Sequence, residues 1–180
     1  MIVCVGASAS GKTELAKTLY NHFGYKKCVT TTTRDKRVGE KDGIDYHFLS
    51  KDQFESLIEN KGFFEVTQYN QNYYGIQKKD VFKQGIIIVD PNGANTLIDQ
   101  LEKDVFVVYV KASELIRRKR MHDRLDDPNL IEKRILNDRE VFKEEHIKRI
   151  DLILYNESEH IEQLAKKVHQ AYQAYMSQHL

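Results

Sequence analysis

Short apolar runs alternate along the chain with longer segments in which apolar residues recur every three or four positions. The runs predict β-strands at residues 2–5, 27–31, 86–90, 105–110 and 151–155. The helical spacing predicts α-helices at residues 12–23, 93–101, 113–123, 129–144 and 158–176. Strands that alternate with helices are typical of an α/β fold with a central parallel sheet. We therefore expect such a sheet with helices on both faces.

Residues 32–76 interrupt this alternation. The segment is polar, rich in tyrosine and punctuated by glycine. One short helix is predicted at residues 51–60, where Ser50 and Gln53 have the spacing of a capping box. Short strands are predicted on either side of it, at residues 46–49 and 63–67. We expect this segment to form a small subdomain inserted into the α/β core.

The first junction between a strand and a helix carries a phosphate-binding motif. Residues 6–13 match the pattern G-x-x-x-x-G-K-[ST] at every fixed position. In such a loop, backbone N–H groups point at phosphate oxygens, the lysine reaches the outer phosphates and the final hydroxyl joins the shell of Mg²⁺. The loop is therefore expected to bind a nucleoside triphosphate through Gly6, Ala7, Ser8, Ala9, Ser10, Gly11, Lys12 and Thr13.

Composition narrows the class of protein. A chain of 180 residues with 41% hydrophobic and 31% charged residues has the size and balance of one globular domain. Its net charge of +1 gives no basis for a nucleic-acid or membrane partner, and no apolar run approaches the ~20 residues of a membrane span. Cys4 and Cys28 form no CxxC pair, and no signal peptide is visible. We expect a cytoplasmic protein whose metal is the Mg²⁺ that accompanies a nucleotide.

The inserted segment contains the side chains for a second anion site. Arg34 and Arg37 can clamp a phosphate monoester, and the hydroxyl groups of Tyr46 and Tyr74 can complete the anion shell. A carboxylate such as Glu65 can accept hydrogen bonds from the N1–H and the 2-amino group of guanine, whereas adenine offers an acceptor at N1. Without the phosphate-binding loop, exposed arginines and partly buried tyrosines would explain the same pattern.

The order of these motifs resembles that of guanylate kinases over nearly the whole chain. The phosphate loop is followed by Thr-Thr-Arg34-x-x-Arg37, Gly39-Glu-x-x-Gly-x-Asp-Tyr46-x-Phe, Phe64-Glu65 and Asn72-Tyr-Tyr-Gly75. The resemblance implies a P-loop three-layer fold with a central parallel sheet, an inserted nucleoside-monophosphate-binding subdomain and a helical lid. It implies one domain over 1–180, with a core at 1–31 and 77–180, a GMP-binding segment at 32–76 and a lid at about 120–140. It also implies transfer of the γ-phosphoryl group of ATP to GMP, and to dGMP, with Mg²⁺.

The resemblance assigns roles residue by residue. The GMP phosphate would be held by Arg34, Arg37, Tyr46 and Tyr74. Guanine would face Thr30, Glu65 and Asp90, with Asp90 also near the water shell of the metal that Thr13 binds. The lid would bring Arg120, Arg124 and Arg134 to the ATP phosphates, and Asn156 would lie at adenine. The catalytic set would then be Lys12, Arg34, Arg120, Arg124 and Arg134.

Several other charged residues receive different predictions. Residues 117–124 hold five cations, but the neutral chain argues against a nucleic-acid patch. Arg117, Arg118 and Lys119 are predicted to lie at the surface, and Arg139 is a further lid candidate. Glu40 and Asp42 are predicted to belong to a solvated turn.

Three positions depart from the family pattern. Ile76 stands where the family has a Ser or Thr that contacts guanine, Ile88 replaces the first acid of an acid-x-Asp stretch, and Leu125 follows Arg124 in place of glycine. Two other functions stay open: a related P-loop kinase for another phosphorylated acceptor such as a ribose bisphosphate, and a non-catalytic guanylate-kinase-like interaction module. The first would lose the guanine-facing residues, and the second would lose the loop lysine or the lid arginines.

Overall fold

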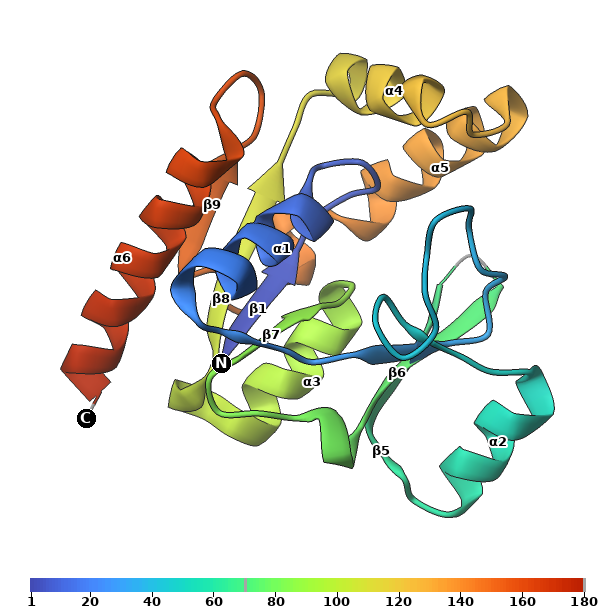
Figure 1. Ribbon diagram of the computed structural model, residues 1–180, viewed down its shortest axis with the longest axis horizontal. Helices are drawn as coiled ribbons and strands as arrows, with labels where there is room; N and C mark the ends of the chain where they lie inside the picture. Colours follow the sequence, from blue (N-terminus) through green and yellow to red (C-terminus); the bar gives the residue numbers. More distant parts are fainter. Residues whose placement is uncertain (70, 180) are drawn as a thin grey trace.

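A five-stranded parallel sheet forms the centre of the molecule in the computed structural model, which describes residues 1–69 and 71–179 (Figure 1). The strand order is β2–β7–β1–β8–β9, and every neighbouring pair is parallel. This confirms the predicted α/β class. The strands are β1 (Ile2–Val5), β2 (Lys26–Lys27), β7 (Gly85–Ile88), β8 (Phe106–Lys111) and β9 (Leu152–Tyr155).

Helices cover both faces of this sheet. Successive residues of a strand point to opposite faces, so Ile2 and Cys4 pack with α1 (Lys12–Phe23) and α6 (Ile161–His179). Val3 and Val5 pack on the other side with α3 (Pro91–Leu101). Beyond the carboxyl ends of the strands lie α4 (Glu114–Asp123) and α5 (Pro128–Val141) (Figure 1). The end of the sheet that carries the phosphate loop therefore faces these two helices.

A second, mixed sheet is built from the inserted segment together with the adjoining Thr30, Thr31 and Gln77. Its order is β4–β3–β6–β5, with β3 (Thr30–Thr32), β4 (His47–Phe48), β5 (Phe63–Tyr69) and β6 (Asn72–Gln77). The helix α2 (Lys51–Glu59) begins at the predicted capping box, in which Ser50 and Gln53 each bond the other's backbone. Phe54 of α2 stacks on Phe63, with ring centres 4.3 Å apart, and so holds the helix to β5.

The prediction of one strand at residues 27–31 is wrong. Lys26 and Lys27 pair with β7 of the parallel sheet, whereas Thr30 pairs with Ile76 of the mixed sheet. The run therefore divides into β2 and β3, which lie in different sheets. The local sequence gives no signal for a boundary between these two strands, because the boundary is set by the strand with which each half pairs.

Other elements complete the chain. The short 3₁₀ helices at Lys78–Asp80, Glu102–Asp104 and Glu144–His146 were not predicted, and neither was β6. Cys4 and Cys28 are buried free thiols, as expected for small apolar residues. Within the two described ranges, no helix has the length and apolar character that a bilayer crossing requires.

Candidate active site

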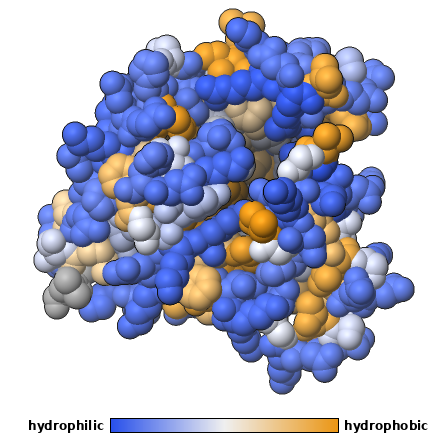
Figure 2. Space-filling view, viewed as in Figure 1, coloured by the Kyte–Doolittle hydropathy of each residue, from blue (hydrophilic) through white to orange (hydrophobic). Residues whose placement is uncertain are grey.

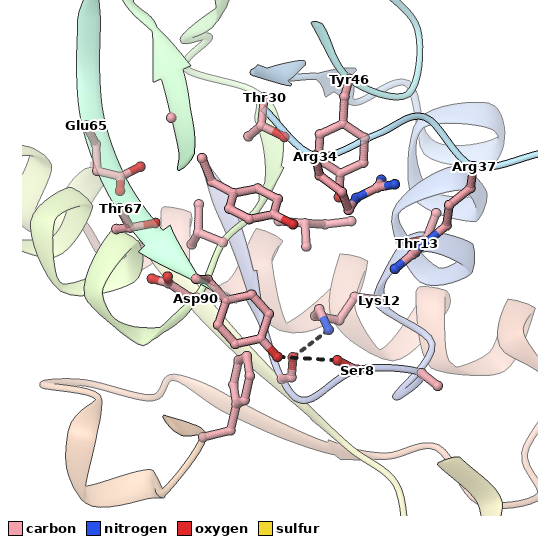
Figure 3. A pocket seen from close by; sticks show the side chains of 18 of the residues that line it. Ser8, Lys12, Thr13, Thr30, Arg34, Arg37, Tyr46, Glu65, Thr67 and Asp90 are labelled. Atoms are coloured by element: carbon pink, nitrogen blue, oxygen red, sulfur yellow. Dashed lines mark hydrogen bonds between the residues drawn. The ribbon is translucent and has the colours of Figure 1, made fainter. Parts of the chain in front are cut away.

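A deep cleft separates the phosphate loop from the mixed sheet (Figure 2). It lies at the carboxyl ends of β1 and β7, where ligands of open α/β sheets bind. Residues from the loop, the inserted segment and the end of β7 meet in it (Figure 3), and Arg124 joins them from the residue directly after α4. Its lining includes Gly6, Ser8, Ala9, Lys12, Thr13, Thr30, Arg34, Arg37, Tyr46, Glu65, Thr67, Tyr69, Tyr74, Gly75, Ile88, Val89, Asp90, Arg124 and Phe142.

Two glycines give the phosphate loop its shape. Gly6 has φ +152°, and a Cβ atom there would lie 2.2 Å from the carbonyl oxygen of Val110. Gly11 has φ +99° at the N-cap of α1, and a Cβ atom there would lie 2.0 Å from Nδ2 of Asn156. Both positions therefore require glycine, by backbone conformation and by close approach.

Lys12 opens α1 and turns back over the loop. Its Nζ atom donates to the carbonyl oxygens of Gly6 and Ala7, the latter at 2.8 Å. Burial lowers the pKa of the Lys12 ammonium to about 8, while the nearby Asp138 carboxylate opposes this shift. Thr13, the next residue of α1, lines the same cleft. The side chains predicted to meet outer phosphates thus lie together at the positive end of a helix.

The predicted phosphate clamp is assembled across the cleft. Arg34, Arg37, Tyr46 and Tyr74 all line it (Figure 3). The Arg34 guanidinium lies 5.4 Å from the centre of the Tyr46 ring, a cation–π distance. The pKa of Arg37 is lowered by burial and by the positive charges of Arg34, Arg124 and Arg134. Because these like charges crowd one another, the cleft is suited to an anion with more than one charge.

The prediction that Glu40 belongs to a solvated turn is wrong. Its carboxylate binds the Arg34 guanidinium with both oxygens, at 2.9 and 3.0 Å, and also accepts from the Arg37 N–H at 2.8 Å. The side chains of Arg34 and Glu40 are only 14% and 18% exposed. A half-buried guanidinium needs a counter-charge, and Glu40 supplies it. Asp42 is exposed as predicted, and its carboxylate accepts from the Phe48 N–H.

Two carboxyl groups face each other at the inner end of the cleft. Burial raises the pKa of Glu65 to about 8, and the negative charge of Asp90 adds to this shift. Burial also raises the pKa of Asp90. Its carboxylate caps α3 by accepting from the Gly93 N–H at 2.8 Å, and this bond and the Thr67 hydroxyl oppose the rise. In the described chain, Oε1 of Glu65 is buried without a hydrogen-bond partner. Because a buried acceptor without a partner costs free energy, this oxygen is expected to accept a hydrogen bond from a ligand.

Thr30 lies close to this end, but Ile76 does not line the cleft. Thr30 is buried in the lining and pairs with Ile76 between β3 and β6. The Ile76 side chain is fully buried in the apolar core beneath the sheet. The departure from the family pattern at Ile76 therefore adds an apolar residue to the core. Ile88, in contrast, lines the cleft at the end of β7.

The predicted lid arginines lie in two places. Arg124 lines the cleft, and its guanidinium shares the Asp126 carboxylate with that of Arg134, at 2.5 and 2.8 Å. Arg120 lies behind the phosphate loop, where it donates to the Ala9 carbonyl at 3.2 Å and to Asn156 at 3.0 Å. Asn156 in turn donates to the Ser10 carbonyl at 2.9 Å.

Two further predictions concern the basic residues Arg117 and Arg139. Arg117 is 5% exposed, so its predicted surface position is wrong, because Asp138 pairs with it inside the molecule. Arg139 does not line the described cleft and pairs with Glu114 at 2.6 Å on the outer side of α4 and α5.

Sequence reasoning missed Thr67, Tyr69, Phe142 and the pair Arg117–Asp138. A signal for the first two exists, since every second residue of a strand shares a face and Glu65 begins the series. The spacing of Asp138 from Ile131 and Ile135 places it on the buried face of α5. No local pattern pairs it with Arg117.

Fold and site together define a class. A phosphate loop at the end of β1, a parallel α/β sheet and an inserted segment with its own cationic clamp define a P-loop nucleotide-binding protein with a second anion site.

Comparison with known proteins gives the family. Residues 1–175 match the family model described as guanylate kinase. The chain is 35% identical to guanylate kinase of Mycoplasma genitalium over 147 residues, which cover 75% of this chain and 60% of that protein. It is 34% identical to guanylate kinase of Sulfurimonas denitrificans over 173 residues, which cover 88% and 80%. The chain belongs to the guanylate kinase family.

A solved structure agrees in fold. The guanylate kinase of Anaplasma phagocytophilum superposes with a TM-score of 0.70 over 96% of this chain and 85% of that one, at 22% identity. The matched region spans about 60% of the length of the first curated relatives.

Proposed function

We propose that this chain transfers the γ-phosphoryl group of ATP to GMP, and to dGMP, to give ADP and GDP. One observation carries the proposal: a single cleft is lined at one side by Lys12 and Thr13 and at the other by Arg34, Arg37 and the unpartnered Glu65 (Figure 3). A donor triphosphate and an acceptor monophosphate would thus meet between the two sides.

The reaction needs little proton chemistry. The nucleophile is a phosphate oxygen of GMP, which is already ionised near neutral pH, so no general base is required. Arg34 and Arg37 hold the acceptor, with the hydroxyl groups of Tyr46 and Tyr74 completing its shell. Catalysis then consists of positioning and of charge neutralisation at the transferred group by Lys12 and the lid arginines Arg120, Arg124 and Arg134.

The guanine base is proposed to bind at the inner end of the cleft. The buried Oε1 of Glu65 has no partner there and accepts from the N1–H or the 2-amino group. Thr30 and Asp90 provide further polar contacts from β3 and from the start of α3. Adenine has no N1–H to donate, so the buried acceptor of Glu65 would stay unsatisfied, at a cost of about 1–3 kcal/mol.

Mg²⁺ belongs to the proposed donor complex. The described residues contain no cluster of three or more acidic, histidine or cysteine ligands. Mg²⁺ with a nucleotide needs only one or two protein oxygens, however, and the Thr13 hydroxyl and the Asp90 carboxylate in this cleft are of that kind. Thr13 would hold the ion directly and Asp90 through water. When bound, the ion neutralises charge on the phosphates.

The chain's organisation follows from this assignment. We propose a core at 1–31 and 77–180, a GMP-binding segment at 32–76 and a lid at about 120–140, with Asn156 near adenine. The buried free thiols of Cys4 and Cys28 support a reducing, cytoplasmic setting.

A coupled assay of ADP release tests the proposal. The protein is given ATP and Mg²⁺ with GMP, dGMP, AMP, UMP or a ribose phosphate in turn. We expect turnover with GMP and dGMP and little with the others. Turnover with AMP but not GMP would refute the role of Glu65. Turnover with a ribose phosphate alone would favour the related P-loop kinase, and GMP binding without any turnover would favour the interaction module.

A further inference from the structure

One buried carboxylate joins three parts of the molecule that the proposed mechanism leaves unconnected. Asp138 lies on α5 and is 2% exposed. Its Oδ2 atom accepts from the backbone N–H of Ser8 at 2.8 Å and pairs with the Arg117 guanidinium. Its Oδ1 atom accepts from the Tyr69 hydroxyl. The phosphate loop, α4 and β5 therefore meet at this side chain.

Arg117 completes the grip on the phosphate loop. Its Nε atom donates to the carbonyl oxygen of Ser8 at 2.8 Å. Both backbone polar groups of Ser8 are thus bound by one ion pair, which reaches the loop from α4 and α5. The next two residues of the loop are also held, because Arg120 and Asn156 bind the carbonyl groups of Ala9 and Ser10.

Tyr69 extends this connection to the acceptor side of the cleft. It is the last residue of β5, on the same strand face as Glu65 and Thr67. Its hydroxyl lies 3.5 Å from Oγ of Ser8, and its ring packs edge-on against Phe142 with centres 6.1 Å apart. Asn137 of α5 also bonds this hydroxyl. The strand that carries the proposed base contact is therefore tied directly to the loop that holds the donor.

Stability alone does not account for such an arrangement. Burying an ion pair costs desolvation energy, and apolar residues of similar volume are often at least as stabilising. Apolar side chains would fill the space between α4 and α5, but they could not bind the two backbone groups of Ser8 or the hydroxyl of Tyr69. The polar network thus supplies orientation, and phosphoryl transfer depends on the relative placement of donor and acceptor.

We propose that Asp138 is a positioning residue, which holds the phosphate loop together with Arg117 and aligns it with the acceptor segment through Tyr69. The inference rests on the proposed function for its kinetic consequence. Asp138 touches no substrate itself and acts through Ser8 and Tyr69.

Four variants separate positioning from folding, the fourth of which combines Tyr69→Phe with the replacement of the ion pair. Replacing Arg117→Leu together with Asp138→Ala removes the ion pair without leaving a buried charge unpaired. Tyr69→Phe removes only the hydroxyl group. The control replaces Arg118→Leu together with Glu132→Ala, because this pair also joins α4 to α5 but lies outside the cleft, with Glu132 57% exposed. Each variant is measured for thermal unfolding, for kcat and KM with ATP and GMP, and for ADP affinity by calorimetry.

We expect the pair-replaced variant to unfold within a few degrees of the parent, to lose up to about 100-fold in kcat and to bind ADP more weakly. Tyr69→Phe should lower kcat while the KM for ATP and the ADP affinity stay unchanged, because the grip on Ser8 remains. Tyr69→Phe should have no further effect in the pair-replaced background. The control should behave as the parent in every assay.

Parental kcat and ADP affinity in the pair-replaced variant would overturn the proposal, as would a kcat loss from Tyr69→Phe that is equal in both backgrounds. If the pair-replaced variant does not fold, Tyr69→Phe decides alone, and parental kcat in it overturns the alignment role. If the parent binds ADP but transfers nothing to GMP, the proposed function fails, whereas the ADP affinities still show whether the ion pair holds the loop.

Discussion

The charged side chains of the cleft differ in the partners that they have in this structure. Arg34 is neutralised by Glu40, Lys12 rests on the loop carbonyls, and Glu65 has an oxygen with no partner. In the proposed complex, phosphate groups replace the present partners of Arg34 and Lys12, and the guanine base supplies a donor to Glu65. The cleft is therefore held by interactions that substrates can replace, and the resulting predictions concern single residues.

Lys12 is the first of these. Replacing Lys12→Ala removes the cation that is proposed to contact the outer phosphates of ATP but leaves Arg34, Arg37 and Glu65 in place. We expect turnover to fall by at least about 10²- to 10³-fold. GMP affinity, measured by calorimetry, should stay near that of the parent. Loss of GMP binding in this variant would mean that the donor and acceptor sides of the cleft are wrongly assigned.

The free energy of unfolding is expected to depend on pH through Glu65. Its pKa lies at about 8 in the folded protein against 4.5 ordinarily, so between these values the folded state holds a proton that the unfolded chain has released. The free energy of unfolding contributed by this group therefore falls as the pH rises through this window. The Glu65→Gln variant has no titrating group at this position, so its free energy of unfolding does not fall for this reason. The melting temperature of nucleotide-free Glu65→Gln should rise relative to the parent between pH 5 and pH 8.5, and parallel curves would contradict the assignment.

At the scale of elements, the turn between α4 and α5 shows how Leu125 is accommodated at a position where the family pattern has glycine. Leu125 has φ +61°, its N–H bonds the His122 carbonyl, and the Asp126 N–H bonds the Met121 carbonyl. This is the Schellman geometry in which glycine is common. The leucine adopts the same turn, and Asp126 behind it gathers Arg124 and Arg134.

Such a leucine is strained by its backbone, and this strain is measurable. A left-handed conformation costs a side-chain-bearing residue about 1–2 kcal/mol, of which glycine returns about 0.5–1 kcal/mol in unfolded-state entropy. Leu125→Gly should therefore raise the free energy of unfolding by up to about 1 kcal/mol in urea titrations. The control Leu136→Gly, also exposed but inside α5, should lower it by about 1 kcal/mol. Destabilisation by both variants would argue against the strain.

At the scale of the whole molecule, the cleft is open and its charged groups are not yet all gathered (Figure 2). Arg124 reaches the cleft, while Arg134 is bound to Asp126 and does not line it. In the proposed reaction, water would compete with GMP as the phosphoryl acceptor in so open a site. The inserted segment and the lid are therefore expected to close over bound substrates.

Closure is testable in solution. An unreactive ATP analogue with GMP should lower the radius of gyration in X-ray scattering and slow amide exchange in residues 32–69 and 120–140. Either nucleotide alone should have a smaller effect, because each engages one side of the cleft. No change with both nucleotides present, at concentrations that calorimetry shows to be saturating, would exclude closure as part of the mechanism.

Local signals were enough for much of this protein. The phosphate loop, the helix at residues 12–23, the capping box at Ser50 and the apolar central strands follow from neighbouring residues, because turn chemistry, capping and periodicity act over a few positions. The order of the motifs also identified several of the residues that line the cleft, including Arg34, Tyr46 and Glu65.

The tertiary structure decided which partner or environment each side chain meets. It divided residues 27–31 between two sheets, buried Ile76 in the core, paired Arg117 with Asp138 and placed Glu40 on Arg34. A charged or apolar side chain has the same local pattern whether it faces solvent, a ligand or a distant partner. Which of these it meets is set by desolvation and by the packing of whole elements, and these exist only once the chain has folded.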